Sequence, residues 1–295
     1  MENIEVSEEF FMPAPPLDEV INNFYCIKRL PEGAPITRHF SPNFEMVLVF
    51  NFGLPLRGSM GNLPLGDLQI DDVAVLGPLK QILHYELLPN ADLIIVTFKL
   101  NGFFRLFNMP LNKLDGKGIY DPDAWIGKPT FKHLWKKLKD LKRTGDRIQL
   151  LTVEGFTLIK PNNEIIQSIV DSEFYFHDPL VSPVKAMAAD AKVTERAIQL
   201  QFQKQTGYSP KELIRFLRFK ELITALVAQP DKEYDVFELI QTYGYHDQSH
   251  LIKDFQQFLG TTPLDFLKNL KGSDFCVAGQ HPAFSKDKPS TETGL

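Results

Sequence analysis

The sequence has few cysteines and lacks the apolar segments that span or enter membranes. Its 295 residues include two cysteines, Cys26 and Cys276, which lie far apart in the chain. Two isolated thiols predict reduced cysteines, not a disulfide framework or a cysteine metal site. No run of about 18 apolar residues occurs, and the first residues are acidic where a secretory signal is basic. We therefore expect a cytoplasmic protein that makes no membrane contact.

Signatures of catalysis are also missing. The sequence has no Gly-x-Ser-x-Gly motif, no phosphate-binding loop and no nucleotide-binding glycine fingerprint. It has no His-x-His pair, and its candidate ligands are the scattered residues His39, Glu45, His84 and Glu86. Single residues of this kind are usually exposed or structural, so we predict no metal site, no cofactor and no catalytic residue. The glycine-rich stretch 53–61 follows a predicted strand without opening a helix, which favours a hairpin turn.

The chain lacks the excess of positive charge that is typical of indiscriminate polyanion binders. It has 32 Lys and Arg against 37 Asp and Glu, which gives a net charge of −5. The C-terminal segment 179–271 is almost neutral, with twelve basic and eleven acidic residues. If this segment binds DNA, its phosphate contacts must come from the local placement of a few cations, which predicts modest affinity at physiological salt.

The residues that are present indicate two domains, since a chain of this length can bury two separate cores. The first third has apolar, β-branched and aromatic runs at 44–52, 73–78 and 93–100, which predict a β-sandwich or barrel. A helix is predicted over 131–141, because apolar residues recur there at helical spacing beside lysines. This helix fits two roles equally well: pairing with its copy in a second chain, or lying on the β-domain.

The second half of the sequence is mostly helical in pattern. The polar tail from Gly272 is expected to be disordered. The predicted helices span 164–176, 184–191, 195–205, 211–229, 235–243, 248–259 and a short stretch after Pro263.

The most informative feature of the sequence is a repeat near the C-terminus. The segment 202–210, Phe-Gln-Lys-Gln-Thr-Gly-Tyr-Ser-Pro, is echoed by 255–263, Phe-Gln-Gln-Phe-Leu-Gly-Thr-Thr-Pro, at a constant offset of 53 residues. Each copy has the pattern of a helix end: an apolar anchor, a glycine suited to the left-handed cap, and a proline that stops the helix. Two equal units at a fixed separation indicate one task done twice, and DNA presents the same surface at regular intervals.

Each unit is predicted to be a helix, a tight turn and a second helix, the arrangement that lays its second helix in a major groove. Both second helices have an apolar face and a face with side chains suited to base edges. The helix 211–229 between the units is nineteen residues long, roughly 28 Å at 1.5 Å per residue. This length is close to the ~34 Å between successive major grooves on one side of B-DNA. A plain helical bundle with solvated polar faces is the alternative, and it does not account for the repeat.

These residues also carry a family resemblance. Residues 164–270 resemble the DNA-binding domain of the AraC/XylS family of bacterial transcription regulators. The resemblance rests on Phe202, the turn 207–210, the stretch 215–218, and above all 240–263, which contains Gly-Tyr-His-Asp-Gln-Ser-His-Leu at 244–251. It implies a seven-helix domain with two helix-turn-helix units that binds promoters in a sequence-specific way.

By position, the resemblance implies base contacts by Arg196 and Gln199 in the first unit and by Ser249, His250 and Lys253 in the second. The whole set that we predict to bind DNA is Arg196, Gln199, Gln203, Lys204, Gln248, Ser249, His250 and Lys253.

The chain departs from the family pattern mainly in the first unit. Leu200 stands where the family usually has Arg, and Gln241 stands where a small residue is usual. Glu195 repels phosphates unless it accepts a hydrogen bond from a cytosine amino group. The second unit is therefore the better-founded DNA contact.

The segment 8–110 is similar, more loosely, to the cupin-like N-terminal domains of AraC-type regulators, which bind an effector or dimerise. We divide the chain into a β-rich, cupin-like sensor or dimerisation domain at 1–110, a helical linker at 111–160, the double helix-turn-helix domain at 161–271 and the tail at 272–295. The fold class that follows is an α+β multidomain protein with a β-barrel or sandwich and an all-α domain.

We therefore predict a sequence-specific DNA-binding transcription regulator that is not an enzyme. Its expected partners are double-stranded promoter or operator DNA, RNA polymerase, a small-molecule effector of unknown identity and a second copy in a homodimer. Two alternatives stay open. One is a metal-dependent cupin-type enzyme with a helical appendage, and the other is a helical interaction module that has lost DNA binding.

Overall fold

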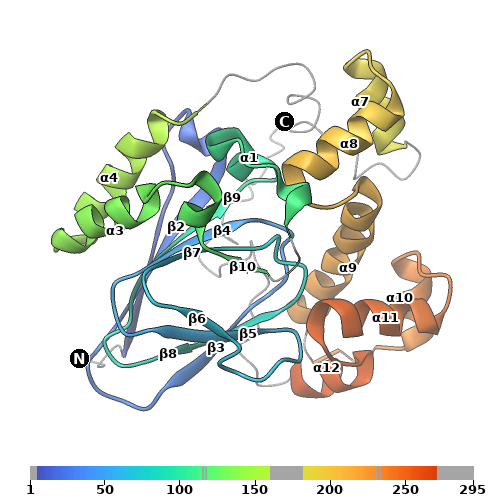
Figure 1. The fold of residues 1–295 in the computed structure, drawn as a ribbon. Coiled ribbons are helices and arrows are strands. Elements are labelled where there is room, and N and C mark those ends of the chain that lie inside the picture. The colour runs from blue at the N-terminus through green and yellow to red at the C-terminus, as the bar shows by residue number, and fades with distance from the viewer. Residues whose placement is uncertain are drawn as a thin grey trace, which may run out of the picture.

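The computed structural model describes residues 5–159, apart from 115 and 117, and residues 182–270, apart from 230 and 233. The helix expected at 164–176 and the tail expected from residue 272 lie outside these ranges. Within them, a β-sandwich with attached helices forms the N-terminal part and a group of helices forms the C-terminal part (Figure 1).

The N-terminal strands form two antiparallel sheets. The larger sheet has the order β1-β2-β9-β4-β7-β10, and the smaller sheet has the order β3-β8-β5-β6. The larger sheet comprises β1 (Val6–Phe11), β2 (Ile21–Arg29), β9 (Asp92–Phe98), β4 (Val47–Asn51), β7 (Val73–Leu76) and β10 (Ile119–Tyr120). The smaller sheet comprises β3 (Ile36–Phe40), β8 (Leu83–Leu87), β5 (Leu56–Met60) and β6 (Leu68–Ile70).

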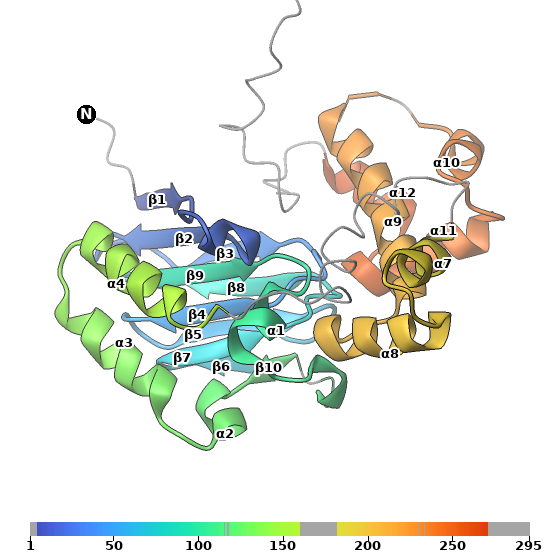
Figure 2. The same cartoon turned by 90° about the horizontal axis from the view of Figure 1, so that it is seen from above.

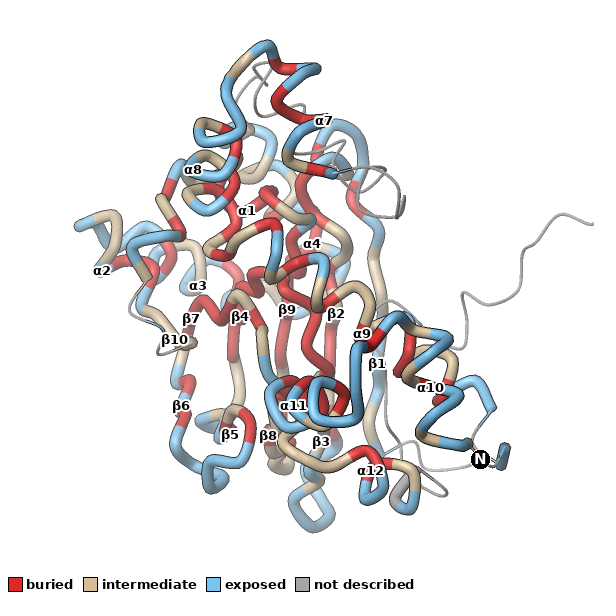
Figure 3. Tube along the Cα trace, turned by 90° about the vertical axis from the view of Figure 1, so that its right-hand side faces the viewer, coloured by how far each residue is buried: buried red, intermediate tan, exposed pale blue. Residues whose placement is uncertain are grey.

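Successive side chains along each strand point to opposite faces of the sheet, and those on the facing sides form the core between the two sheets. In β8, Leu83, Tyr85 and Leu87 are buried against the larger sheet, while His84 and Glu86 on the opposite face are half-buried. All five residues of β4 are buried, because helices cover the outer face of the larger sheet (Figure 3). The predicted sandwich is therefore confirmed, with one correction. The stretch 53–61 is not a hairpin turn, because Leu56–Met60 forms strand β5 in the other sheet.

Four α-helices and two short 3-10 helices complete the N-terminal part. They are η1 (Leu17–Glu19), α1 (Gly102–Phe107), η2 (Leu111–Lys113), α2 (Pro122–Ile126), α3 (Thr130–Asp140) and α4 (Thr144–Phe156). The helix predicted at 131–141 lies on the β-domain, which is one of the two roles considered for it. Phe131 and Leu138 are buried on the larger sheet, and the Trp135 indole N–H donates to the Asn51 carbonyl at 2.6 Å. Helices α3 and α4 thus share a core with the strands, and residues 5–159 pack as one unit (Figure 2).

The C-terminal part contains six described helices around an aromatic core. They are α7 (Pro183–Asp190), α8 (Glu195–Thr206), α9 (Pro210–Ala228), α10 (Val236–Thr242), α11 (Gln248–Leu259) and α12 (Pro263–Leu270). These bounds agree with the predicted helices to within a residue or two at each end. Local sequence explains two of the helix ends. Gly207 and Gly260 end α8 and α11 with φ of 79° and 68°, in the left-handed region that glycine adopts readily.

Candidate nucleic-acid interface

Two helices present polar faces that suit DNA. Helix α8 begins at the N-cap Thr194, whose hydroxyl accepts from the Ala197 N–H, and α11 begins at Asp247, whose carboxylate accepts from the His250 N–H. Each helix follows a short turn and a preceding helix, so α7–α8 and α10–α11 form the two predicted helix-turn-helix units.

The inward faces of both second helices are as predicted. Ile198 and Phe202 of α8 are fully buried, as are Leu251 and Phe255 of α11. Burial of these residues fixes the rotation of each helix about its axis. The opposite faces are therefore directed to solvent.

The structure places the predicted DNA-binding residues on those outer faces. Lys204 is half-buried, with its ammonium 5.6 Å from the Phe104 ring centroid of the N-terminal part. The other predicted residues are exposed: Arg196, Gln199, Gln203, Gln248, Ser249, His250 and Lys253. Leu200 is also exposed on α8, at 50% of its surface, which puts an apolar side chain on the first polar face.

Helix α9 joins the two units. Its 19 residues correspond to roughly 28 Å, as the sequence predicts. A capping box starts the helix, because the Ser209 hydroxyl accepts from the Glu212 N–H and the Glu212 carboxylate accepts from the Ser209 N–H. One face of α9 is buried along its whole length, from Leu213 to Leu226, so it supports both units at once.

A buried polar network attaches α11 to α9. The Asp254 carboxylate is 2% exposed and accepts hydrogen bonds from the Arg215 guanidinium at 2.6 Å and the Tyr245 hydroxyl at 3.0 Å. One turn further along α9, the Arg218 guanidinium donates to the Gly244 carbonyl at 2.9 Å. Burial, together with the charge of Asp254, raises the pKa of Tyr245 well above its ordinary value, so the tyrosine stays a donor. This network determines where the second recognition helix lies on α9.

Sequence reasoning missed Asp254. The available signal was its position, one residue before Phe255 on the apolar side of α11, where an acidic residue must have a partner to be buried.

An aromatic residue of the N-terminal part is inserted into the helical core. Phe44, in the connection between β3 and β4, is 3% exposed and stacks on Phe216 with ring centroids 4.3 Å apart. Its ring also meets Tyr208 and Phe258 edge-on, at 4.9 and 6.0 Å. The φ of Phe44 is 60°, a costly conformation for a bulky residue. The two parts of the chain therefore share one apolar cluster.

Polar contacts surround this aromatic contact. The Asn101 amide donates to the Gln205 side-chain oxygen at 2.9 Å, and the Ile82 N–H donates to the Phe258 carbonyl at 2.9 Å. Lys80 forms an ion pair with Glu212, also at 2.9 Å. Desolvation raises the pKa of Glu212, but hydrogen bonds from Ser209 and Lys80 outweigh it, so the net pKa is lowered.

Both copies of the repeated helix end take part in these contacts. A β-carbon added at Gly207 would lie 3.0 Å from the Pro78 side chain, and one at Gly260 would lie 2.1 Å from the Asn62 side-chain oxygen. The glycines that cap α8 and α11 therefore also permit the close approach of the N-terminal part. We call this whole contact, centred on Phe44 and reaching both helix ends, the interdomain junction.

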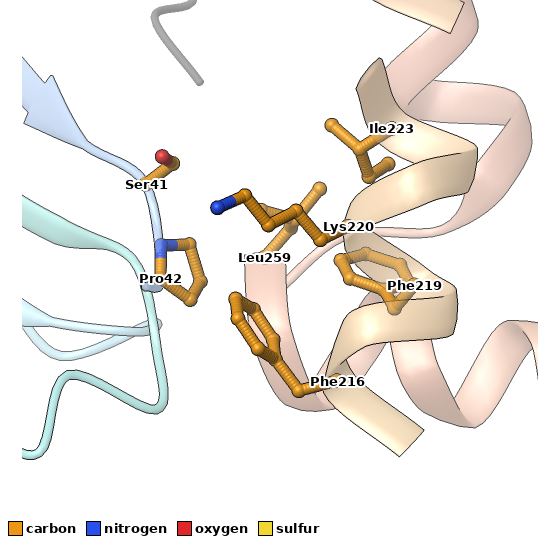
Figure 4. A pocket seen from close by; sticks show the side chains of 7 residues that line it. All are labelled: Ser41, Pro42, Phe216, Phe219, Lys220, Ile223 and Leu259. Atoms are coloured by element: carbon orange, nitrogen blue, oxygen red, sulfur yellow. The ribbon is translucent and has the colours of Figure 1, made fainter. Parts of the chain in front are cut away.

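A small pocket opens at the edge of the interdomain junction (Figure 4). Its enclosed space is about 10 Å³, and its lining is apolar apart from the Lys220 ammonium and the Ser41 hydroxyl. A space of this size holds about one water molecule. The lining residues are Ser41, Pro42, Phe216, Phe219, Lys220, Ile223 and Leu259.

The structure does not gather the four candidate metal ligands that the sequence offers into one group. Glu45 accepts from the amides of Asn22 at 2.7 Å and Asn43 at 2.9 Å, whereas His39 and His84 lie directly opposite each other on β3 and β8. Across residues 5–159 and 182–270, with their gaps, no group of three or more His, Cys, Asp or Glu side chains is arranged to hold a metal ion. Nor is any helix in those ranges long and apolar enough to cross a membrane.

Two family models match the chain. Residues 187–269 match a model described as a helix-turn-helix domain, and residues 9–119 match a domain of unknown function. The first match covers the helices α8 to α11 on which the predicted DNA-binding residues lie, and it confirms the predicted helix-turn-helix region.

One curated relative and several solved structures are similar to the chain. Over 79 residues the chain is 28% identical to regulatory protein HrpB of Ralstonia nicotianae, and these residues are 27% of this chain but 17% of HrpB, so the chain spans only a small part of that relative. Among solved structures, ToxT from Vibrio cholerae is similar over 85% of this chain and 98% of its own, with 12% identity and a TM-score of 0.38. A Klebsiella pneumoniae protein with a double-stranded β-helix domain is similar over 33% of this chain and 79% of its own, with 15% identity and a TM-score of 0.24.

Proposed function

We propose that this chain, whose C-terminal part is a helix-turn-helix domain of the AraC type, is a transcription regulator that binds promoter DNA in a sequence-specific way. The observation that carries the proposal is the pair of exposed polar faces on α8 and α11, held by one continuous helix, α9. The length of α9, roughly 28 Å, is close to the ~34 Å between successive major grooves, so one chain can place a helix in each of two adjacent grooves.

The proposed base contacts follow from side-chain chemistry. Arg196 suits the O6 and N7 acceptors of guanine, and Gln199 suits the donor and acceptor edge of adenine. In the second unit, Ser249, His250 and Lys253 lie on the exposed face. Since Asp254 is paired within the core, it does not add a charge to the side of α11 that faces the DNA.

Regulation is proposed to act through the interdomain junction. The N-terminal part contacts the C-terminal ends of both recognition helices, through Gly207 and Gly260. A change in the connection that holds Phe44 therefore alters the position of α8 and α11 together, and with it their fit to two successive grooves. This is a way for a signal in the N-terminal part to change DNA affinity without contact to DNA.

A small effector is proposed to act at the pocket beside the interdomain junction. The pocket is too small for an organic ligand as it stands, so an effector must widen it. The apolar lining and the Lys220 ammonium suit a compact effector with an apolar body and an anionic group. Ser41 and Pro42 belong to the same connection as Phe44, so a ligand that widens the pocket displaces that connection.

We propose RNA polymerase and a second copy of the chain as further partners of a promoter-binding regulator. A regulator that binds promoters acts by recruiting or blocking RNA polymerase, and a homodimer would double its DNA contacts. The rival proposal, a metal-dependent cupin-type enzyme, predicts stoichiometric bound metal in a three-ligand site of the β-domain.

Selection of bound DNA from a random duplex pool tests the proposed function. The full chain is expected to enrich one sequence motif, and the charge-reversed variant Arg196→Glu/Lys253→Glu is expected to lose the enrichment. The variant Lys142→Glu, at an exposed site on the N-terminal part, is the matched control. Enrichment of no motif by the wild type, or the same motif from the charge-reversed variant, would contradict the proposal.

A further inference from the structure

Two histidines face each other on the outer side of the smaller sheet. His39 of β3 and His84 of β8 are direct cross-strand partners, with Nδ1 atoms 2.6 Å apart and ring centroids 4.7 Å apart. His39 is exposed and His84 is half-buried. Their strands are held in register by pairs on either side, from Ile36 opposite Leu87 to Phe40 opposite Leu83. The two imidazoles are thus kept together by the sheet.

The geometry points to a binding site for one divalent transition-metal ion of the Zn²⁺, Ni²⁺ or Cu²⁺ class, with His39 and His84 as its two protein ligands. Imidazole nitrogen is a preferred ligand of these ions. A tetrahedral ion bound at 2.0–2.1 Å by each nitrogen holds the two nitrogens about 3.3 Å apart. In the structure the two Nδ1 atoms share a hydrogen bond, so one of them carries a proton. Binding of the ion releases that proton to solvent, as is general for metal ligands, and the two atoms separate. Water fills the remaining positions around the ion.

The surroundings of His84 favour this assignment. His84 also forms a hydrogen bond with the backbone of Gly61. Histidine ligands of metal ions usually have their second ring nitrogen in a hydrogen bond of this kind, which fixes the tautomer.

The position of the two ligands connects the ion to the interdomain junction. His84 lies two residues after Ile82, and the Ile82 N–H donates to the Phe258 carbonyl of α11. His39 lies five residues before Phe44, and the Phe44 ring lies in the helical core. An ion that links His39 to His84 therefore acts on both strands that lead into the junction. That consequence rests on the proposed function, whereas binding of the ion does not.

Calorimetric titration of the metal-free full chain with Zn²⁺, and separately with Cu²⁺, tests the site in the absence of DNA. The wild type is expected to bind one more ion per chain than the variant His39→Gln/His84→Gln. Mg²⁺, which prefers oxygen ligands, is expected to show no such difference. His133→Gln, on the exposed face of α3, is the matched control and is expected to bind like the wild type.

The residues His246 and His250 need a separate control, because their ring centroids are 5.8 Å apart. The variant His246→Gln removes any ion held there and is expected to leave the ion at His39 and His84 in place. Hydrogen exchange locates the ion: Zn²⁺ is expected to slow exchange at 36–46 and 82–87 in the wild type but not in His39→Gln/His84→Gln. Identical isotherms for the wild type and that variant, at equal thermal stability, would overturn the proposal.

Discussion

At the scale of single residues, Phe44 links the N-terminal part to the helical core. It belongs to the N-terminal part by sequence and to the helical core by contact, where it meets Tyr208, Phe216 and Phe258. Its left-handed φ shows that the backbone accepts strain to place this ring. The packing of three aromatic rings around it compensates for that strain.

Replacing Phe44 by alanine is therefore expected to lower the free energy of unfolding by about 3–5 kcal/mol, the usual cost of removing a buried phenylalanine. Phe237→Ala is the matched control, because Phe237 is 72% exposed and surface changes stay within about 0.5 kcal/mol. Urea unfolding followed by far-ultraviolet circular dichroism measures both. Equal midpoints for the two variants would mean that Phe44 does not hold the domains together.

Asp254 has a comparable role for the second recognition helix. The variant Asp254→Ala leaves Arg215 and Tyr245 without their buried partner and is expected to cost about 3 kcal/mol of stability. The double variant Arg215→Met/Asp254→Leu removes both charges and is expected to recover most of that loss. Thermal unfolding of both variants, in the same buffer, checks the comparison. A double variant no more stable than Asp254→Ala would contradict the ionic interpretation.

At the scale of elements, α8 and α11 have the same construction but different outer faces. Helix α8 carries the exposed Glu195 and Leu200, and Lys204 is partly covered by the N-terminal part. The described outer face of α11 carries Ser249, His250 and Lys253. The two helices are therefore expected to read different bases, and α11 to contribute more to affinity.

Single alanine variants test this difference. Lys253→Ala is expected to weaken DNA binding by about 1–3 kcal/mol if Lys253 contacts a base, and to lower the slope of log affinity against log salt by about 1 if it contacts a phosphate. Lys204→Ala is expected to change the DNA affinity and the salt slope less than Lys253→Ala does, because the Lys204 ammonium lies near Phe104. Fluorescence anisotropy with the selected duplex at several salt concentrations measures both. A larger effect of Lys204→Ala would reverse the ranking.

The start of α9 is expected to respond to acid. The folded-state pKa of Glu212 is lowered, so its contribution to stability is present above the unfolded pKa of about 4.3 and is lost as pH falls through the folded pKa. Lys80→Met removes one cause of the lowering. The wild type is therefore expected to lose more stability than Lys80→Met as pH falls from about 5 to 3. Glu212 is partly exposed, so the difference is expected to stay below about 1 kcal/mol.

Much of this architecture is legible in the sequence, because it depends on local patterns. Cap residues such as Thr194 and Gly207, and apolar spacing in α9 and α11, are short-range signals, and they predict the helix bounds closely. The interdomain junction depends on contacts between distant residues. Nothing near Phe44 distinguishes it from the strand residues that follow, and nothing near Asn101 indicates Gln205. The His39–His84 pair was also unpredictable, since it depends on the register of β3 and β8.

At the scale of the whole molecule, the arrangement is two parts joined by the interdomain junction, with Phe44 at its centre and polar contacts around it. The N-terminal sandwich meets both helix-turn-helix units near their repeated glycines, and α9 holds the units at a fixed separation. The two copies of the repeat, 53 residues apart, thus end α8 and α11, contact the N-terminal part, and belong to the helices that we propose to contact DNA. Binding of two adjacent grooves by one chain is the claim on which this account depends.

Mapping of protected bases on the selected duplex, by methylation protection with the full chain, tests that claim most directly. Two protected segments are predicted in the major groove, about 10–10.5 base pairs apart on one side of the helix. Arg196→Ala/Gln199→Ala is predicted to remove one segment, and Ser249→Ala/Lys253→Ala the other. A single protected segment, or the loss of both segments in each variant at unchanged thermal stability, would contradict it.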